Sequence, residues 1–258
     1  MPTQIAEWIS VGLAGAAVLA VNACATPESW GATPAAPQAT TSAHIEPSFS
    51  PDRLDAKSSL TFTIHYTGGE LGVPSPVRRS VLRFPAGVSL ELPELDSCPA
   101  SRLQAHGAPG CRPQSKLGSG SALVEVRAGS QTLSEDVSLA VFLGPPRNLQ
   151  PTFEILAQGD TPFDERVVLA GAMLPDHSPY GQALSIVVPP IRTLTFEPDA
   201  SIVTFSLTIG PSHRHRGAPA DAVVMPSSCP AGGFPFAAEF SYADGSSGRA
   251  TATAPCPR

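Results

Sequence analysis

The chain has 258 residues, of which 42% are hydrophobic and 15% are charged, and its formal net charge at pH 7 is −6. This hydrophobic content is sufficient for a buried core, and β domains of about 200 to 250 residues commonly fold as one unit. The negative charge and the scattered Lys and Arg residues provide no basic surface, so we exclude nucleic-acid-binding proteins.

The first 25 residues have the pattern of an export signal. Residues 11–21 form an apolar run of the length found in signal-peptide cores, and this run is too short to span a bilayer. It ends at Val21-Asn22-Ala23-Cys24, which resembles the lipobox of bacterial lipoproteins. Cys24 is therefore the predicted lipidation site, and its lipid would attach the exported protein to the outer face of the cytoplasmic membrane.

Two features of this signal depart from a lipobox pattern. Asn22 is unusual in a lipobox, and Glu7 precedes the apolar run where a Lys or Arg is expected. The sequence Ala23-Cys24-Ala25 also fits an ordinary signal-peptidase site, and cleavage there would release an extracellular protein. The sequence leaves both alternatives open.

Residues 26–43 are rich in Ala, Pro, Thr and Ser and have no hydrophobic periodicity, which predicts a flexible, disordered linker. If the linker is extended at about 3.1 Å per residue, it reaches roughly 55 Å. The folded domain is then expected over residues 44–258. The alternative is a pair of β subdomains over residues 44–146 and 150–258.

Short strands bounded by Pro, Gly, Asp or Ser are predicted through most of this domain. In the first of them, Leu60, Phe62, Ile64 and Tyr66 alternate with polar residues, as in a strand with one buried face. Similar patterns cover residues 81–84, 123–127, 137–143, 166–173, 184–188 and 202–209. Many short strands separated by turns predict an all-β fold, which we expect to be an antiparallel sandwich of Ig-like or jelly-roll-like type.

A hairpin is predicted near the C-terminus. Large side chains alternate through residues 234–242, and Ala alternates with Thr through residues 250–254. A loop of three or five residues would pair Phe240 with Ala250 and Phe236 with Ala254, which places small side chains opposite large ones. Because Pro235 lacks a backbone donor, the first arm is expected at a sheet edge.

The cysteines predict two disulfides. Without Cys24 four remain, which are Cys98, Cys111, Cys229 and Cys256, and an even number in an exported chain fits a disulfide framework. Sequential pairing fits the local elements best, because one pair flanks a short helical excursion over residues 99–107 and the other closes the hairpin. No CxxC motif is present, which argues against a zinc or redox site.

Motifs of catalysis are missing: there is no HExxH, no GxSxG and no phosphate loop. Residues 118–121 (GSGS) lead into a strand and are interpreted as a bulge or turn. Residues 176–178 contain the three residue types of a hydrolase triad, but adjacent residues cannot form that geometry, so we interpret them as a turn before Pro179.

Two segments were considered as metal sites. His213 and His215 are spaced to share one face of a strand, but their segment is better explained as a solvated basic loop. Asp160, Asp164 and Glu165 are interpreted as exposed carboxylates of a turn, because their spacing does not match a calcium site. We therefore predict no catalytic, cofactor-binding or metal-binding residue.

Several stretches resemble motifs of uncharacterised secreted, lipoprotein-like proteins of actinobacteria. They are residues 84–87 (FPAG), Cys98-Pro99 through Cys111, residues 161–168 (TPFDERVV), residues 189–191 (PPI) and residues 229–236 (CPAGGFPF). The resemblance covers roughly residue 84 to the C-terminus. It implies export and a shared β-sandwich scaffold, and it transfers no catalytic residue.

Two functional classes remain. The first is an exported cell-envelope protein that displays a disulfide-stapled sandwich for binding or for a structural role, with an envelope protein or a glycan as partner. The alternative is an extracellular hydrolase or carbohydrate-active enzyme whose site is assembled from residues distant in sequence. The missing motifs favour the first class. Glycan binding is disfavoured, because Trp8 and Trp30 lie outside the predicted domain and Tyr180 is the only obvious exposed aromatic residue.

Overall fold

The computed structural model describes residues 40–69, 72–92, 96–194, 197–210, 214–215, 218–219 and 223–257. The predicted lipidation site Cys24, most of the predicted linker, and His213 lie outside the described residues. The described residues belong to one compact unit.

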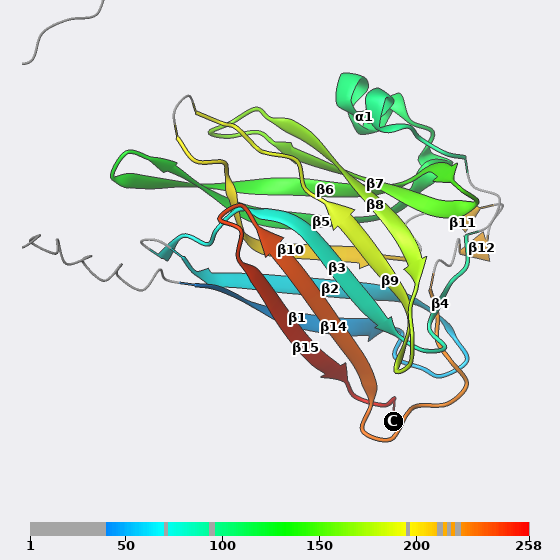
Figure 1. The fold of residues 1–258 in the computed structure, drawn as a ribbon. Coiled ribbons are helices and arrows are strands. Elements are labelled where there is room, and N and C mark those ends of the chain that lie inside the picture. Colours follow the sequence, from blue (N-terminus) through cyan, green and yellow to red (C-terminus); the bar gives the residue numbers. More distant parts are fainter. Residues whose placement is uncertain are drawn as a thin grey trace, which may run out of the picture. The chain divides into compact units, whose positions relative to one another are not determined.

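This unit is built from antiparallel strands and one short α-helix, which confirms the predicted all-β class (Figure 1). The strands are β1 (Thr41–Ser50), β2 (Lys57–Gly68), β3 (Val77–Pro85), β4 (Ser89–Leu90), β5 (Lys116–Ala128), β6 (Gln131–Arg147), β7 (Gln150–Gly159), β8 (Arg166–Pro175), β9 (Tyr180–Val187), β10 (Ser201–Ile209), β11 (Arg214–His215), β12 (Ala218–Pro219), β13 (Val223–Val224), β14 (Phe234–Tyr242) and β15 (Ser247–Ala254). The helix is α1 (Ala100–His106), and two 3-10 turns follow it, η2 (Ala108–Gly110) and η3 (Pro113–Ser115).

One continuous sheet forms both layers of the sandwich. Its order is β15-β14-β3-β9-β8-β7-β6-β5-β10-β2-β13-β4, and β1 pairs with β2 as well. The sheet curls so far that its edge strands β1 and β15 lie side by side (Figure 1). Strands from the two halves of the chain interleave, since β2 pairs with β10 and β3 pairs with both β9 and β14.

Aromatic side chains join the two ends of this sheet across its interior. The ring of Phe62 on β2 lies 6.1 Å from that of Phe236 on β14, and the ring of Tyr66 lies 5.2 Å from that of Phe240 in an edge-on arrangement. These residues are the alternating large side chains of the two strands. The period of two therefore puts them on one face, and the curl of the sheet brings those faces together.

The C-terminal hairpin has the predicted odd loop but a different register. Phe240 lies opposite Gly248 and Phe236 opposite Ala252, so each partner is two residues earlier than predicted. The turn is centred on Asp244, whose Oδ1 accepts a hydrogen bond from the Ser246 N–H at 2.8 Å. The residue after Asp244 is a glycine with a φ of 83°, which the bulged three-residue turn requires. Large side chains still lie opposite small ones, because a register shift of two residues leaves every side chain on the same face of the sheet.

The hairpin also differs from prediction in its position in the sheet. The edge strand is β15, whereas β14 lies between β15 and β3, so the prediction of an edge position for the first arm is wrong. Pro235 is tolerated because the pairing of β14 with β3 begins only at Ala237.

Two of the long strands, β1 and β7, were not predicted, nor were the two-residue strands β4, β11, β12 and β13. The linker was expected to extend to residue 43, but β1 begins at Thr41, and it buries only every fourth residue, such as Ile45 and Phe49. Strand β7 was missed because Ile155 on one face and Leu156 on the other are both buried, which removes the alternating pattern.

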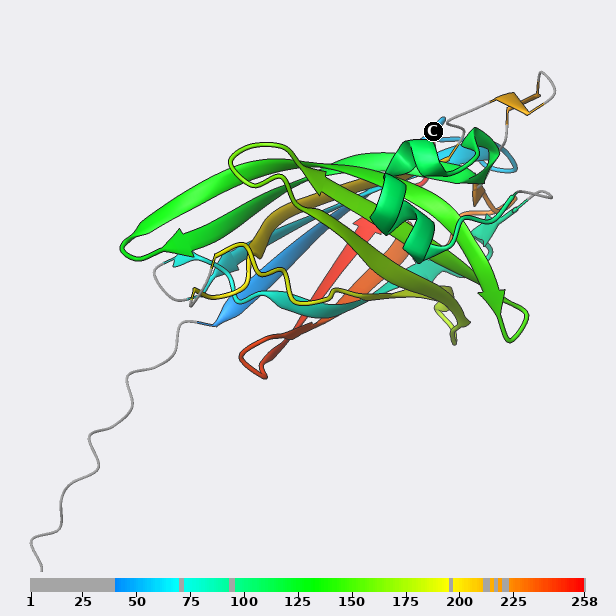
Figure 2. The same cartoon turned by 90° about the horizontal axis from the view of Figure 1, so that it is seen from above.

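Helix α1 explains why both faces of β7 are covered, since it lies on the outer side of β7 and β8 (Figure 2). It extends from the N-cap Pro99 to the C-cap Gly107, as predicted. Its Leu103 is fully buried in a small outer cluster with Phe142 and Leu156. Among the described residues, no helix is long and apolar enough to cross a membrane.

The segment over residues 118–121 is a strand rather than a turn. Gly120 pairs with Leu207 of β10, and a Cβ on Gly120 would overlap the carbonyl oxygen of Ser206. The glycine thus allows close approach of two backbones. A bulge does lie at the start of this segment, between Lys116 and Gly118 in the pairing with β6.

Candidate functional site

An apolar cavity lies between the inner face of the sheet and the segment that joins β9 to β10. We call it the interior pocket. Its walls include Val124 of β5, Leu139 of β6 and Leu169 of β8, and Ile191 and Ala200 contribute from the connecting segment. The cavity volume is about 50 Å³. One buried water needs about 10 to 15 Å³, so the pocket has room for several small heavy atoms.

One carboxyl group interrupts this aliphatic wall. Glu135 occupies an inward position of β6, opposite Val124, and its exposed fraction is only 4%. Its Oε1 atom has no hydrogen-bond partner. Gly159 at the end of β7 leaves space for the carboxyl group, because a Cβ at that position would overlap Oε1. Burying a carboxyl oxygen without a hydrogen-bond partner lowers the stability of the fold. The position of Glu135 in the core therefore suggests a role other than packing.

The surroundings of Glu135 disfavour its charged form. Burial raises the pKa of the Glu135 carboxyl, and the nearby charge of Asp160 adds to the increase. Backbone hydrogen bonds from Phe163, Asp160 and Thr161 act in the opposite direction and offset part of it. A bound molecule that donates a hydrogen bond to Oε1 would therefore stabilise this carboxyl group.

The pocket contains a second polar atom without a partner. The Oγ1 atom of Thr193, in the segment between β9 and β10, is buried and makes no hydrogen bond. Glu165 also borders the pocket, but it is exposed to solvent. The pocket thus combines an apolar wall with two buried polar groups that are available to a ligand, which is the usual composition of a small-molecule site.

A smaller cavity adjoins the interior pocket toward the centre of the core. The two share Leu169, Ile202 and Phe205 as wall residues, and the smaller cavity has a volume of about 10 Å³. Tyr66 and Ser80 border it on the far side. Burial raises the pKa of the Tyr66 hydroxyl, which therefore stays protonated. The apolar space consequently continues inward from the interior pocket.

Another apolar cavity, of about 30 Å³, is lined by Leu60, Phe84 and Phe153 among others. As far as the structure describes the chain, it shares no lining residue with the interior pocket, and no unpartnered buried atom belongs to its lining. The second buried glutamate of the described chain, Glu154, is also 4% exposed with a free Oε2, but it lines neither cavity. It therefore provides a comparison for Glu135.

The residues that sequence analysis considered for catalysis do not form a site. Asp176 forms an ion pair with Arg83, and its Oδ1 accepts a hydrogen bond from the His177 backbone N–H at 2.8 Å. The Tyr180 N–H donates to the His177 carbonyl at 2.9 Å, which closes the predicted turn. Within the described part of the chain, no group of three or more His, Cys, Asp or Glu residues is placed to hold a metal ion. Asp160, Asp164 and Glu165 are exposed, as expected of turn carboxylates.

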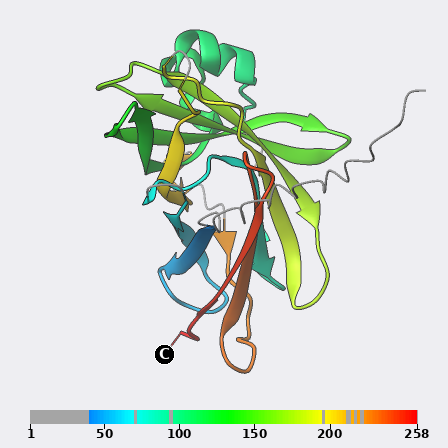
Figure 3. The same cartoon turned by 60° about the vertical axis from the view of Figure 1, so that its left-hand side comes forward.

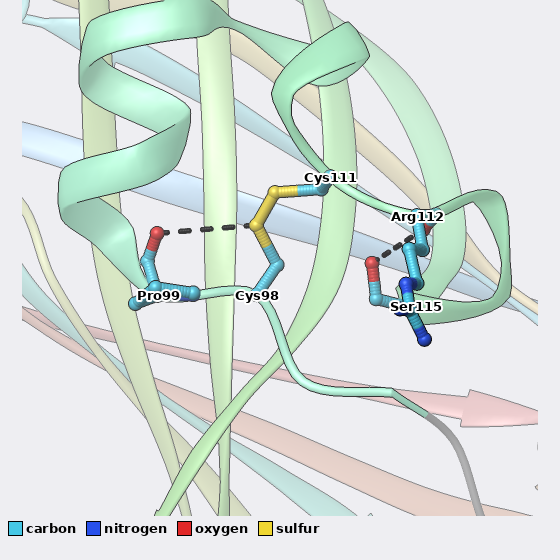
Figure 4. The surroundings of a disulfide bond; sticks show 5 residues. All are labelled: Cys98, Pro99, Cys111, Arg112 and Ser115. Carbon is cyan, nitrogen blue, oxygen red and sulfur yellow. Dashed lines mark hydrogen bonds between the residues drawn. A yellow bond between two sulfur atoms is a disulfide. The ribbon is translucent and has the colours of Figure 1, made fainter.

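Both disulfides of the structure have the sequential pairing. Cys98 and Cys111, with Cα atoms 5.7 Å apart, enclose helix α1 (Figure 4). The Cys98 N–H donates to the Leu143 carbonyl at 2.7 Å, which fixes the start of this excursion to β6. The disulfide thereby attaches the helix to the outer face of the sheet.

The second disulfide closes the hairpin where its strands have ended. Cys229 and Cys256 have Cα atoms 5.8 Å apart, and the C-terminal end lies beside the segment that precedes β14 (Figure 3). Strict continuation of the register would place the partner of Cys229 beyond Cys256. A turn absorbs the offset, as predicted, because the Gly233 N–H donates to the Pro230 carbonyl at 3.0 Å.

No protein-family model, curated protein or solved structure matches this chain. The candidate site therefore depends on the geometry of the chain alone. Sequence analysis missed Glu135 because the predicted strand began at residue 137. If that strand is extended by two residues, Glu135 lies on the same face as Val137, which places a carboxylate on the core face. This alternation was the signal that the sequence offered.

Proposed function

We propose that the protein is an exported, non-enzymatic binding protein that takes the apolar part of a small molecule into the interior pocket. The observation that supports this most strongly is the buried carboxyl of Glu135 in an aliphatic cavity, because its Oε1 atom has no hydrogen-bond partner. An unsatisfied buried acceptor costs on the order of 1–3 kcal/mol. A bound donor would offset that cost, and functional sites commonly retain groups that lower stability.

Export is supported by the two disulfides, since such bonds persist in oxidising compartments. The apolar run that ends at Cys24 supports the same proposal and adds attachment to the membrane through a lipid. A binding domain held at the outer face of the membrane by a linker would meet small molecules in the cell envelope.

Export and lipidation can be separated by fractionating an actinobacterial host that expresses the full chain. We expect the protein in the membrane fraction, and Cys24→Ala should move it out of that fraction because the lipid anchor is lost. Recovery of the unaltered protein in the medium with Thr26 as its first residue would refute lipidation alone. Recovery in the cytosol would refute export.

Filling the pocket should weaken binding. Ala157 lines the interior pocket, and Ala157→Leu adds three carbon atoms to the space that a ligand would occupy. We expect this variant to weaken the binding of octanol, a neutral probe with one unbranched chain, by about tenfold or more. The measurement is a calorimetric titration of the purified domain.

The matched control is Ala252→Leu. Ala252 is also partly buried against the core, but it belongs to β15 and does not line the pocket. It should leave the affinity for the probe unchanged. Equal affinity of both variants and the unaltered protein would contradict binding in the interior pocket.

A further inference from the structure

We propose that the ligand of the interior pocket is a cationic amphiphile, whose ammonium group binds Glu135 and whose single apolar chain lies along the wall formed by β5, β6 and β8. This inference rests on the proposed function and names the class of molecule. It follows from the charges at the pocket, the geometry of the carboxyl group and the direction in which the apolar space continues.

The charges that face the pocket are all negative. Glu135 and Glu165 line it, and Asp160 is close enough to Glu135 for its charge to raise the pKa of that carboxyl. Among the described residues, the lining contains no Lys, Arg or His. A ligand with an anionic head would add a further negative charge at a site of low dielectric, whereas a cation would relieve the existing repulsion.

The carboxyl of Glu135 lacks the partner that a cation would supply. Its Oε1 is free, and the side chain is held against Gly159. An ammonium group donates hydrogen bonds, and charge-assisted hydrogen bonds to a carboxylate are about twice as strong as neutral ones. The Oγ1 of Thr193 could accept another of its protons, because that oxygen is also without a partner.

The apolar space sets the shape of the rest of the ligand. The wall residues of β6 run from Glu135 to Leu139, a distance along the strand of roughly 13 Å. The adjoining cavity beyond Leu169 and Phe205 extends this path toward Tyr66. With a volume of about 50 Å³, the pocket has room for a few carbon atoms, so it suits part of one unbranched chain and is too small for a fused ring system.

The test compares three ligands with the same tail and different heads: octylamine, octanol and octanoate, titrated at neutral pH by calorimetry. The unaltered full-length protein should bind octylamine at least about tenfold more tightly than octanol, and octanoate should bind most weakly. Glu135→Gln should reduce the preference for the amine over the alcohol to within about threefold, because the amide keeps the shape but not the charge.

Glu154→Gln is the matched control, since Glu154 is equally buried, also has a free oxygen and lies outside the pocket. It should keep the preference for the amine. If the unaltered protein binds octanol as tightly as octylamine, or binds octanoate more tightly, the proposal of a cationic ligand is wrong, but the proposed function stands because an apolar chain still binds. This comparison uses the unaltered protein alone, so it does not depend on the folding of any variant. Failure of all three ligands to bind would instead overturn the proposed function.

Discussion

Phe236→Ala is expected to lower the free energy of unfolding by about 3–5 kcal/mol, the range measured for truncating a buried phenylalanine. The side chain is fully buried, and its ring centroid lies 5.9 Å from Phe49, 6.1 Å from Phe62 and 6.3 Å from Phe84. It therefore joins four strands, β14 with β1, β2 and β3. Its removal would leave a void at the place where the two ends of the curled sheet meet.

Chemical denaturation of the purified domain measures this loss. Leu149→Ala is the control, because Leu149 is 96% exposed in the turn between β6 and β7 and its truncation should change stability by less than about 0.5 kcal/mol. A loss of less than about 1 kcal/mol for Phe236→Ala would contradict the arrangement in which Phe236 joins the two ends of the sheet.

Removing the hairpin disulfide by the double substitution Cys229→Ser and Cys256→Ser is expected to lower the free energy of unfolding by about 3.5 kcal/mol. The two cysteines are 27 residues apart in sequence, and a loop of this length restricts the unfolded chain by that amount. The corresponding change at Cys98 and Cys111, which are 13 residues apart, should cost about 3 kcal/mol.

The two disulfide variants should differ more in where the structure loosens than in total stability. Strand β15 is an edge strand in the hydrogen-bonded order, and its last residue Ala254 lies two residues before Cys256. Loss of the hairpin disulfide should therefore expose the amides of β15 to hydrogen exchange first, while loss of Cys98–Cys111 should affect α1. Unchanged protection of β15, or peptide mapping that links Cys98 or Cys111 to either hairpin cysteine, would contradict this account.

The local features of the fold could be predicted from sequence, and those that depend on distant contacts could not. The alternation through residues 234–242 predicts which side chains of β14 face the core, and the structure agrees. The register could not be derived, because turns centred on Asp244 and on Gly245 give the same faces and differ only in the hydrogen bonds of the turn. Strand β7 was hidden because helix α1, contributed by an earlier segment, covers its outer face.

Sequence analysis did not reveal the interior pocket. Glu135 and Thr193 are distant in sequence and come together only because the segment after β9 crosses over the inner face of β6 and β8. No local motif encodes such a site. A charged residue at an inward position of a strand is the one signal that a sequence carries, and by itself it does not distinguish a ligand group from a satisfied core residue.

The central claim, that an apolar chain enters the interior pocket, is tested most directly by nuclear magnetic resonance of methyl-labelled protein with bound octanol. The account predicts intermolecular nuclear Overhauser effects between the chain of octanol and the methyl groups of Val124, Leu139 and Leu169, which line the pocket. Contacts confined to the exposed side chains of Leu174 and Val187, which are 41% and 53% exposed, would contradict it.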